Sequence, residues 1–372
     1  MTNIDALLNT LKLETSSSVN TALVIITIVL LFSGIFQLRM ILSKTNKVDP
    51  TATSFTISPP IQNTDFDKKT ILGDYHVLGS YNSCCIGDYT NDYVSLKQLN
   101  KVIQCGIRMV DLEVFTVKGE TVVASSDSDS DFSRRGSKNS IPFASCLQTI
   151  KYSLRRAPNK NDPFFIQIRM KTNIKHSYDE VAKQIKYNLQ DMLLSSLYSS
   201  NAKYLPYDFE NEFMHNLRNK IIIIVHDYSN ILESTYLYEY TNIHLEPHSG
   251  CRYKDLEHSS DQHNKEMSTR NKMLFSVALP DKQSIQNASV NKAVDLGFHG
   301  ILINFQRQDS NFTNTLQLFA LDGNTRSYRL RKDNNRNIPQ EKTICSNSKV
   351  GDNIPVKATI NILGQDNTYS SG

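Results

Sequence analysis

Short β-favouring runs alternate with helical patterns from about residue 75 to residue 335, and this alternation constrains the fold of the 372-residue chain most strongly. Helical patterns are predicted over Leu96–Gln104, Ala144–Arg155, Tyr178–Leu197 and Val290–Leu296. Strands are predicted over Tyr75–Leu78, Met109–Phe115, Thr121–Val123, Phe164–Ile168, Ile221–Val225, Leu274–Val277 and Ile301–Asn304. Alternation over roughly 260 residues matches the size of a TIM-like (β/α)8 barrel. The pattern alone leaves an open α/β sheet as the alternative.

An apolar run over residues 22–38 precedes this region and contains only three polar side chains. About 17 to 25 such residues can span a bilayer, so the run predicts a single transmembrane helix over residues 21–42. A cleaved signal peptide is the alternative, but no small-residue cleavage motif follows the run. Arg39, Lys44 and Lys47 all follow it, which predicts a cytosolic C-terminal domain.

Composition limits the classes of function. The formal net charge is only +4, so no nucleic-acid partner is expected. The six cysteines form no Cys-x-x-Cys pair, which argues against a zinc site. Their scatter through predicted strands and helices indicates buried free thiols in a reducing compartment.

Three segments carry a specific resemblance: Leu78-Gly-Ser-Tyr-Asn-Ser-Cys84, Arg108-Met-Val-Asp-Leu-Glu-Val-Phe115 and Thr121-Val-Val-Ala-Ser-Ser126. In this order they resemble the opening strands of the phosphoinositide-specific phospholipase C catalytic barrel. Leu274–Pro280 and Ala293–Gln306 are similar to segments of the second, or Y, half of that barrel. The resemblance implies a barrel built from an X-like and a Y-like half.

These observations predict seven regions. They are an N-terminal tail (1–20), a transmembrane anchor (21–42), a flexible linker (43–69), an X-like half-barrel (70–240), a polar linker (241–271), a Y-like half-barrel (272–335) and a polar C-terminal tail (336–372).

The resemblance implies that the two catalytic histidine positions are replaced. Tyr81 stands at the first position and Ser125 at the second. His76 is an odd number of residues from Tyr81, so in an extended strand it points to the opposite face and is predicted to pack in the core. Loss of a general acid or base typically costs about 10² to 10⁴ in rate, and here both are lost.

The calcium position of the resembled family is altered as well. Asn82, Asp111 and Glu113 match three of its four ligand positions, and the two carboxylates share one face of a strand. Arg169 stands at the fourth, and a guanidinium cannot bind a metal. Calcium binding is therefore not expected and no other cofactor is predicted. Arg169 is predicted either to form a salt bridge with Asp111 or Glu113, or to hold a substrate phosphate.

The positions that grip substrate in the resembled family also differ. His226 matches a substrate-binding lysine and Ile224 its partner lysine, while Val277 and Leu279 match an arginine and a tyrosine. Asn82 and His226 stay as candidate substrate-binding residues together with Arg169.

An acidic run covers Ser125 to Ser133, with Asp127, Asp129 and Asp131 at alternate positions. An EF-hand loop counted from Asp127 requires glycine at its sixth position and glutamate at its twelfth, which here are Phe132 and Lys138. The sequence therefore predicts a disordered acidic loop, open to phosphorylation, instead of a calcium loop.

Together these features predict a membrane-anchored, phospholipase C-like protein that is catalytically inactive and binds membrane lipid of the phosphoinositide class as a scaffold or binding module. Two alternatives stay open: an active, calcium-independent phosphodiesterase with a rearranged site, and a structural membrane protein. No protein partner is identified.

Overall fold

The computed structural model describes residues 24–39, 69–132, 135–200, 209–245, 250–321, 324–336, 361–362 and 365–366. The chain divides into the units Met1–Asn337 and Ile338–Gly372. In the second unit, β14 (Asn361–Ile362) pairs antiparallel with β15 (Gln365–Asp366). The predicted tail over 1–20, almost all of the predicted linker over 43–69 and most of the predicted tail over 336–372 fall outside the described residues.

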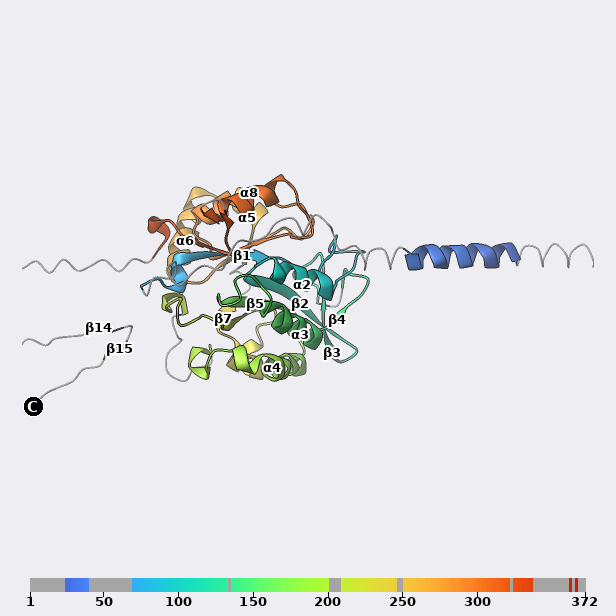
Figure 1. Ribbon diagram of the computed structural model, residues 1–372, viewed down its shortest axis with the longest axis horizontal. Helices are drawn as coiled ribbons and strands as arrows, with labels where there is room; N and C mark the ends of the chain where they lie inside the picture. Colours follow the sequence, from blue (N-terminus) through green and yellow to red (C-terminus); the bar gives the residue numbers. More distant parts are fainter. Residues whose placement is uncertain are drawn as a thin grey trace, which may run out of the picture. The chain divides into compact units, whose positions relative to one another are not determined.

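Parallel strands form a nearly closed barrel in the first unit (Figure 1). Neighbouring strands follow the order β7-β6-β5-β2-β1-β10-β9-β8, in which every pairing is parallel. Their bounds are β1 (Tyr75–Ser80), β2 (Met109–Val117), β5 (Phe164–Lys171), β6 (Ile221–Asp227), β7 (Ile243–Leu245), β8 (Gly250–Arg252), β9 (Val277–Leu279) and β10 (Gly300–Ile303). The predicted TIM-like barrel is confirmed, with β7 and β8 at the two ends of the strand order.

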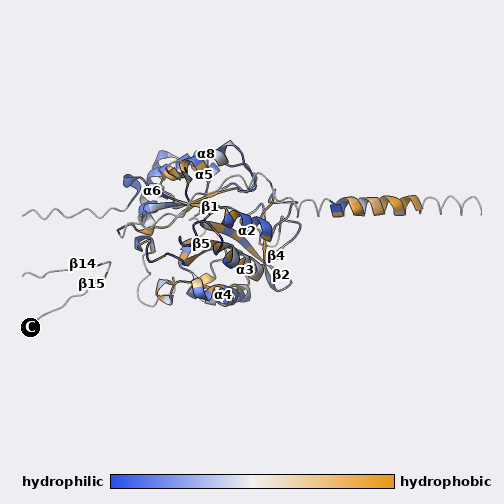
Figure 2. Cartoon of the chain, viewed as in Figure 1, coloured by the Kyte–Doolittle hydropathy of each residue, from blue (hydrophilic) through white to orange (hydrophobic). Residues whose placement is uncertain are grey.

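Helices cover the outside of the barrel. They are α2 (Leu96–Gln104), α3 (Phe143–Leu154), α4 (Lys175–Leu189), α5 (Tyr253–Glu257), α6 (Asp261–Met273), α7 (Asn291–Asp295) and α8 (Ser310–Leu318). Of these, α2, α3 and α4 each bury an apolar face. Helix α2 begins at Ser95, whose side chain accepts a hydrogen bond from the backbone of Lys97, and it buries Leu99, Val102 and Ile103. Figure 2 shows the apolar colour gathered on the strands and the polar colour on the outer helices.

Short elements complete the described fold. The 3₁₀ helices are η2 (Leu72–Asp74), η3 (Gln190–Met192), η4 (Ser196–Tyr198), η5 (Phe209–Asn211), η6 (Leu232–Ser234), η7 (Tyr236–Tyr240) and η8 (Asp333–Asn335). The remaining strands are β3 (Glu120–Ala124), β4 (Ile141–Pro142), β11 (Ala320–Leu321), β12 (Asn324–Thr325) and β13 (Tyr328–Leu330). Strand β3, predicted over Thr121–Val123, runs antiparallel to β2 and is a side hairpin instead of a barrel strand.

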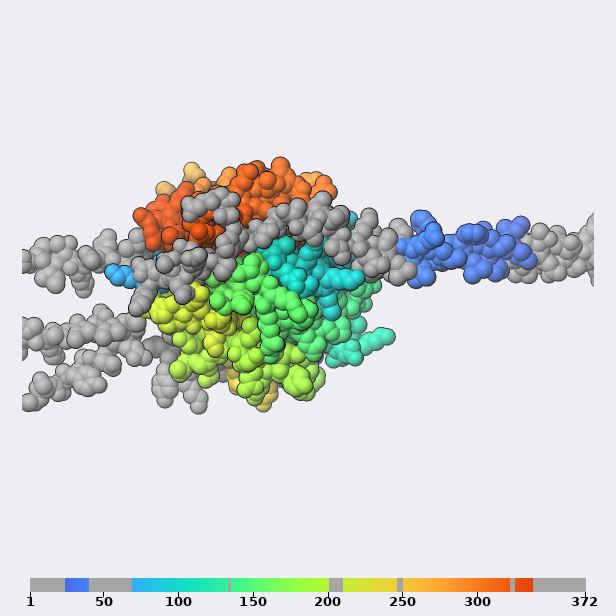
Figure 3. Space-filling model, viewed as in Figure 1, coloured from blue at the N-terminus to red at the C-terminus, as the bar shows by residue number. Residues whose placement is uncertain are grey.

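The segment predicted as a polar linker, residues 241–271, contains barrel strands β7 and β8, helix α5 and most of α6. The polar composition of this segment concealed these elements, because both strands have only three residues and α6 buries only Asn271. Strand β8 pairs with β9 all along its length, so this segment is part of the barrel wall. In Figure 3 the first part of the barrel, in blue-green, lies against its last part, in orange. This agrees with the pairing of β1 with both β2 and β10.

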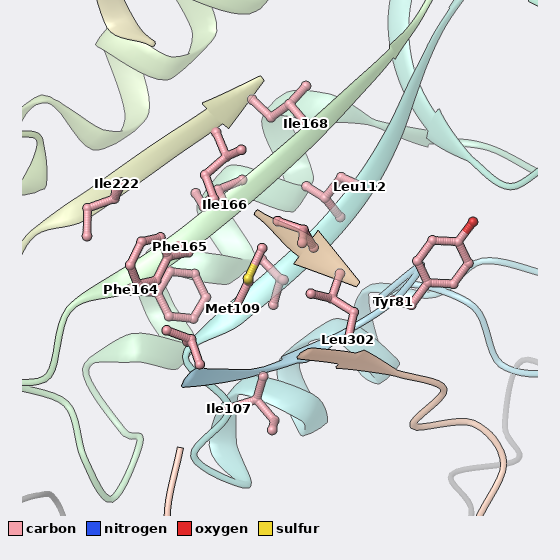
Figure 4. Packing of buried hydrophobic residues seen from close by; sticks show 14 of the residues in the cluster. Tyr81, Ile107, Met109, Leu112, Phe164, Phe165, Ile166, Ile168, Ile222 and Leu302 are labelled. Carbon is pink, nitrogen blue, oxygen red and sulfur yellow. The ribbon is translucent and has the colours of Figure 1, made fainter. Parts of the chain in front are cut away.

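Apolar side chains from the strands fill the barrel away from its C-terminal end (Figure 4). Met109 occupies the centre, since a Cβ placed on Gly79 or Gly300 would lie 3.1 Å from its side chain. Phe165 stacks on Phe275 with ring centroids 5.7 Å apart. Figure 4 shows Tyr81 at the edge of this cluster, with its hydroxyl pointing away from the aliphatic side chains.

The predicted transmembrane anchor over residues 21–42 is not supported. The structure describes residues 24–39 of this segment, all of them in a helix. Among the described helices, none has both the length and the apolar character needed to cross a membrane.

Candidate functional site

A fully buried guanidinium, that of Arg169, lies at the C-terminal end of the barrel strands and links three segments. Its Nε and Nη2 donate to the two carboxylate oxygens of Asp111, both at 2.8 Å. Nη1 donates to Glu113 Oε1 at 2.5 Å, and Nη2 also donates to Asn82 Oδ1 at 2.7 Å. The predicted salt bridge is confirmed, and it involves both carboxylates.

Local structure explains why these groups meet. Asp111 and Glu113 are two residues apart on β2 and so point to the same, inward face, and Glu113 is in register with Arg169 on β5. Asn82 follows β1 with a φ of +41°, a left-handed conformation that asparagine tolerates better than most residues. Its backbone N–H donates to Asp111 Oδ2 at 2.9 Å, which fixes the amide beside Arg169.

Lys282, in the segment after β9, is a second cation at Glu113. The Nζ of Lys282 donates to Glu113 Oε1, and the Ser126 backbone N–H donates to Oε2 at 2.7 Å. Burial alone would raise the pKa of Glu113, but Arg169 and Lys282 outweigh burial and hold that pKa below its ordinary value. The carboxylate is therefore ionised and fully paired.

The two positions that match catalytic histidines hold side chains with structural contacts. Tyr81 is fully buried, with the Arg169 guanidinium 4.5 Å above its ring and its hydroxyl accepting from Arg252 Nη1 at 3.0 Å. Ser125 donates from Oγ to the backbone carbonyl of Tyr89 at 2.7 Å. Neither arrangement provides the imidazole that general acid–base catalysis uses most often.

The acidic loop is held at the mouth of the barrel, contrary to the prediction of disorder for the part that the structure describes. Asp129 Oδ2 accepts from Arg252 Nη2 at 2.5 Å, and its Oδ1 lies 3.5 Å from Lys282 Nζ. The Lys171 ammonium donates to the backbone carbonyls of Ser128 and Asp129 at 2.7 and 2.6 Å. Charge pairing at the strand ends orders the loop, and the sequence by itself does not reveal where those cations lie.

The other predicted residues lie where their strands place them. His226 on β6 is in register with Arg169 and stacks on Tyr228 with centroids 4.3 Å apart. Val277 and Leu279 are buried in β9 and Ile224 in β6, as apolar core side chains. His76 is buried with Nδ1 2.6 Å from the Phe298 carbonyl oxygen, and burial lowers its pKa to about 4; its predicted packing role is confirmed.

A calcium ion does not fit the residues that are present. Asn82, Asp111 and Glu113, which match ligand positions, each accept a hydrogen bond from Arg169, and its positively charged guanidinium lies between them. In the described part of the chain, no group of three or more acidic, histidine or cysteine side chains is placed to hold a metal. The arrangement can bind an anion at the mouth better than a cation within it.

Arg252, Lys282 and Lys171 were not predicted as site residues. Arg252 ends β8 and Lys171 ends β5, while Lys282 comes three residues after β9. Functional side chains in this fold gather where the parallel strands end, so charged residues at strand ends were the available signal. Arg252 was hidden because its strand was assigned to a linker.

Comparison with known proteins agrees with this geometry. Residues 69–227 match the family model of the phosphatidylinositol-specific phospholipase C X domain. The crystal structure of PLC21 from L. pealei superposes with a TM-score of 0.56 at 14% identity, covering 72% of this chain and 38% of that one. PLC21 from S. officinalis gives the same TM-score and coverage at 15% identity. No curated protein was found to match the chain in sequence.

The barrel therefore has a phospholipase C-like fold, and its first part, residues 69–227, matches the X domain of phosphatidylinositol-specific phospholipase C. The chain is similar to these proteins in fold, and its matched part spans 38% of the length of each PLC21 chain.

Proposed function

We propose that this protein is a non-catalytic phospholipase C-like module that binds the phosphate-bearing headgroup of a membrane lipid. The observation that carries the proposal is Arg169, whose guanidinium takes hydrogen-bonding positions on Asn82, Asp111 and Glu113 that a metal would need. Phosphodiester cleavage needs a base, an acid and positive charge on the phosphate. Tyr81 and Ser125 do not supply the first two.

The lipid ligand is supported by two independent points. The matched family model is named for phosphatidylinositol. The mouth of the barrel also carries Arg252, Lys282 and Lys171, which are suited to an anionic headgroup. The apolar run over residues 22–38 supports association with a membrane, and the cations that follow it support a cytosolic barrel.

A turnover assay tests the catalytic half of the proposal. The full-length protein is incubated with phosphatidylinositol vesicles, once with calcium and once with chelator, beside an active calcium-dependent phospholipase C. We expect no inositol phosphate above the vesicle blank in either buffer. Release that is abolished by Arg252→Gln would instead establish a calcium-independent phosphodiesterase.

Sedimentation with vesicles tests the binding half. Phosphatidylcholine vesicles with and without phosphatidylinositol are compared, because the apolar run alone would bind both. We expect a preference for the phosphatidylinositol vesicles. Equal binding to both compositions would refute headgroup recognition and leave a structural membrane role.

A further inference from the structure

We propose that the mouth of the barrel contains an anion site for a single phosphate group, formed by Arg252 and Lys282 and filled in this structure by the chain's own Asp129. The ligand class rests on the proposed function. The site itself rests on the contacts of the Asp129 carboxylate.

Two hydrogen-bond donors and two further cations, from separate parts of the barrel, surround that carboxylate. Arg252 Nη2, at the end of β8, donates to Oδ2 at 2.5 Å. The Tyr228 hydroxyl, after β6, donates to Oδ1 at 3.2 Å. Lys282 Nζ lies 3.5 Å and Arg169 Nη1 3.9 Å from the same Oδ1. Donors that converge on one anion from several strand ends form a built site, because each is positioned by a different barrel element.

The balance of charge shows which cation needs an external partner. Below the mouth, Arg169 and Lys282 balance the two buried carboxylates of β2. Two cations remain, and one of them, Lys171, donates to the backbone carbonyls of Ser128 and Asp129. The other, Arg252, has Asp129 as the carboxylate in its ion pair, and its other hydrogen bonds go to the neutral Tyr81 hydroxyl and the Pro280 carbonyl. Without Asp129, the site would hold an excess positive charge.

Asp129 enters from the solvent side. Its side chain is 35% exposed, whereas those of Arg252 and Lys282 are 13% and 8% exposed. The next residues of the loop, Ser130, Asp131 and Phe132, line a surface pocket of about 620 Å³ together with Thr116, Lys171 and the residues that follow β5. The Asp129 carboxylate is therefore the outermost group of the ion cluster, and it can move out without breaking the ion pairs that Arg169 and Lys282 form beneath it.

A phosphate group suits the vacated position. Like the carboxylate it carries negative charge, but its tetrahedral oxygens can accept from Arg252, Lys282 and Tyr228 at once, and charge-assisted hydrogen bonds of this kind are the strong ones. Burial alone would raise the pKa of Asp129, but Arg252 and Lys282 outweigh it and hold that pKa below its ordinary value, so the site favours an anion at neutral pH. Because the loop competes with the ligand, measured affinity is reduced by the fraction of molecules with an open site.

The test is calorimetric titration of the full-length protein with inorganic phosphate. In Asp129→Asn we expect at least about tenfold tighter binding than in the wild type, because the competing charge is gone. Asp127→Asn, at an exposed position in the same loop, is the matched control and should bind like the wild type. Arg252→Gln introduced together with Asp129→Asn should abolish the gain. Equal affinity in the wild type and Asp129→Asn, or a gain that survives Arg252→Gln, would overturn the proposal.

A vesicle arm separates this inference from the proposed function. A parallel gain of Asp129→Asn on phosphatidylinositol vesicles identifies the lipid as the phosphate source. A gain for inorganic phosphate without one for vesicles supports the anion site with a soluble ligand and counts against the lipid function. A preference for phosphatidylinositol vesicles without a gain in phosphate affinity supports the lipid function and refutes the proposal that Asp129 occupies a phosphate site. Asp129→Ser is a second variant that removes the competing carboxylate. Failure of both Asp129 variants to fold in saturating phosphate would also refute the proposed phosphate site.

Discussion

Replacement of Arg169 by methionine should destabilise the barrel strongly, because it leaves Asp111 and Glu113 buried without their shared cation. Glu113 retains Lys282 and the Ser126 N–H, so the larger loss falls on Asp111, which gives up both charge-assisted bonds of 2.8 Å. Breaking a buried pair by removing one partner typically costs about 3 to 5 kcal/mol. For a domain of this size that corresponds to roughly 6 to 20 °C in Tm.

Arg108→Met is the matched control for this experiment. Arg108 is equally buried, but its three guanidinium nitrogens have no hydrogen-bond partner among the described residues, and burial lowers its pKa to about 10. Its guanidinium carbon lies 5.5 Å from the centre of the Phe164 ring, and Asp162 is its carboxylate partner. Because no charge-assisted hydrogen bond is lost, this replacement should cost less than that of Arg169. Thermal unfolding followed by circular dichroism compares the two variants. The charge-pair argument is refuted if Arg169→Met melts no lower than Arg108→Met.

The deficit of Arg169→Met should also depend on pH. The pKa of Glu113 is lowered in the folded protein, so its contribution to stability is present above its unfolded pKa of about 4.3 and is lost as pH falls through the folded pKa. In the variant, the pKa of Glu113 loses the lowering effect of Arg169 while burial still raises it, so this carboxylate protonates at a higher pH than in the wild type. We therefore expect the difference in free energy of unfolding between wild type and variant to shrink as pH falls from 7 toward 4. A difference that is constant over this range would point to lost packing instead of lost charge.

Two further predictions concern the same cluster. Arg169→Glu places a third carboxylate beside Asn82 and the acids of β2. In chelator this variant should be less stable than the wild type, and its Tm should rise on addition of calcium but not of sodium at equal ionic strength. A Tm equal to that of the wild type in chelator would contradict this prediction. Burial lowers the pKa of Lys171 from 10.5 to about 8, so between those values the unfolded chain holds a proton that the folded chain releases, and stability should rise with pH. Urea unfolding of wild type and Lys171→Met at pH 7 and 9.5 measures this contribution, because titrations common to both proteins cancel in the difference between their free energies of unfolding. If that difference is the same at both pH values, the pKa of Lys171 is not lowered.

The strands that the sequence predicted best are long, apolar and central. The predicted strand over Phe164–Ile168 is the first part of β5, which continues through Arg169 to Lys171. Its end was missed because inward polar residues interrupt the apolar pattern at the mouth of the barrel, where pairing of charge replaces apolar burial. Strand β8 was missed for a related reason, since Gly250–Arg252 has no apolar pattern and is defined only by its hydrogen bonds to β9.

The chemical identities that define the site could be read from the sequence alone: a tyrosine and a serine stand at the positions that match histidines, and an arginine with a permanent charge excludes a metal. It also predicted that Arg169 would pair with Asp111 or Glu113, and the register of β2 on β5 places it beside both. Only the tertiary structure decided that Asp129, Arg252 and Lys282 meet at one point, because residues more than a hundred positions apart become neighbours when the barrel brings its strand ends together. Local sequence patterns report on a strand's own burial, whereas the partners of its terminal charges depend on how the whole barrel is assembled.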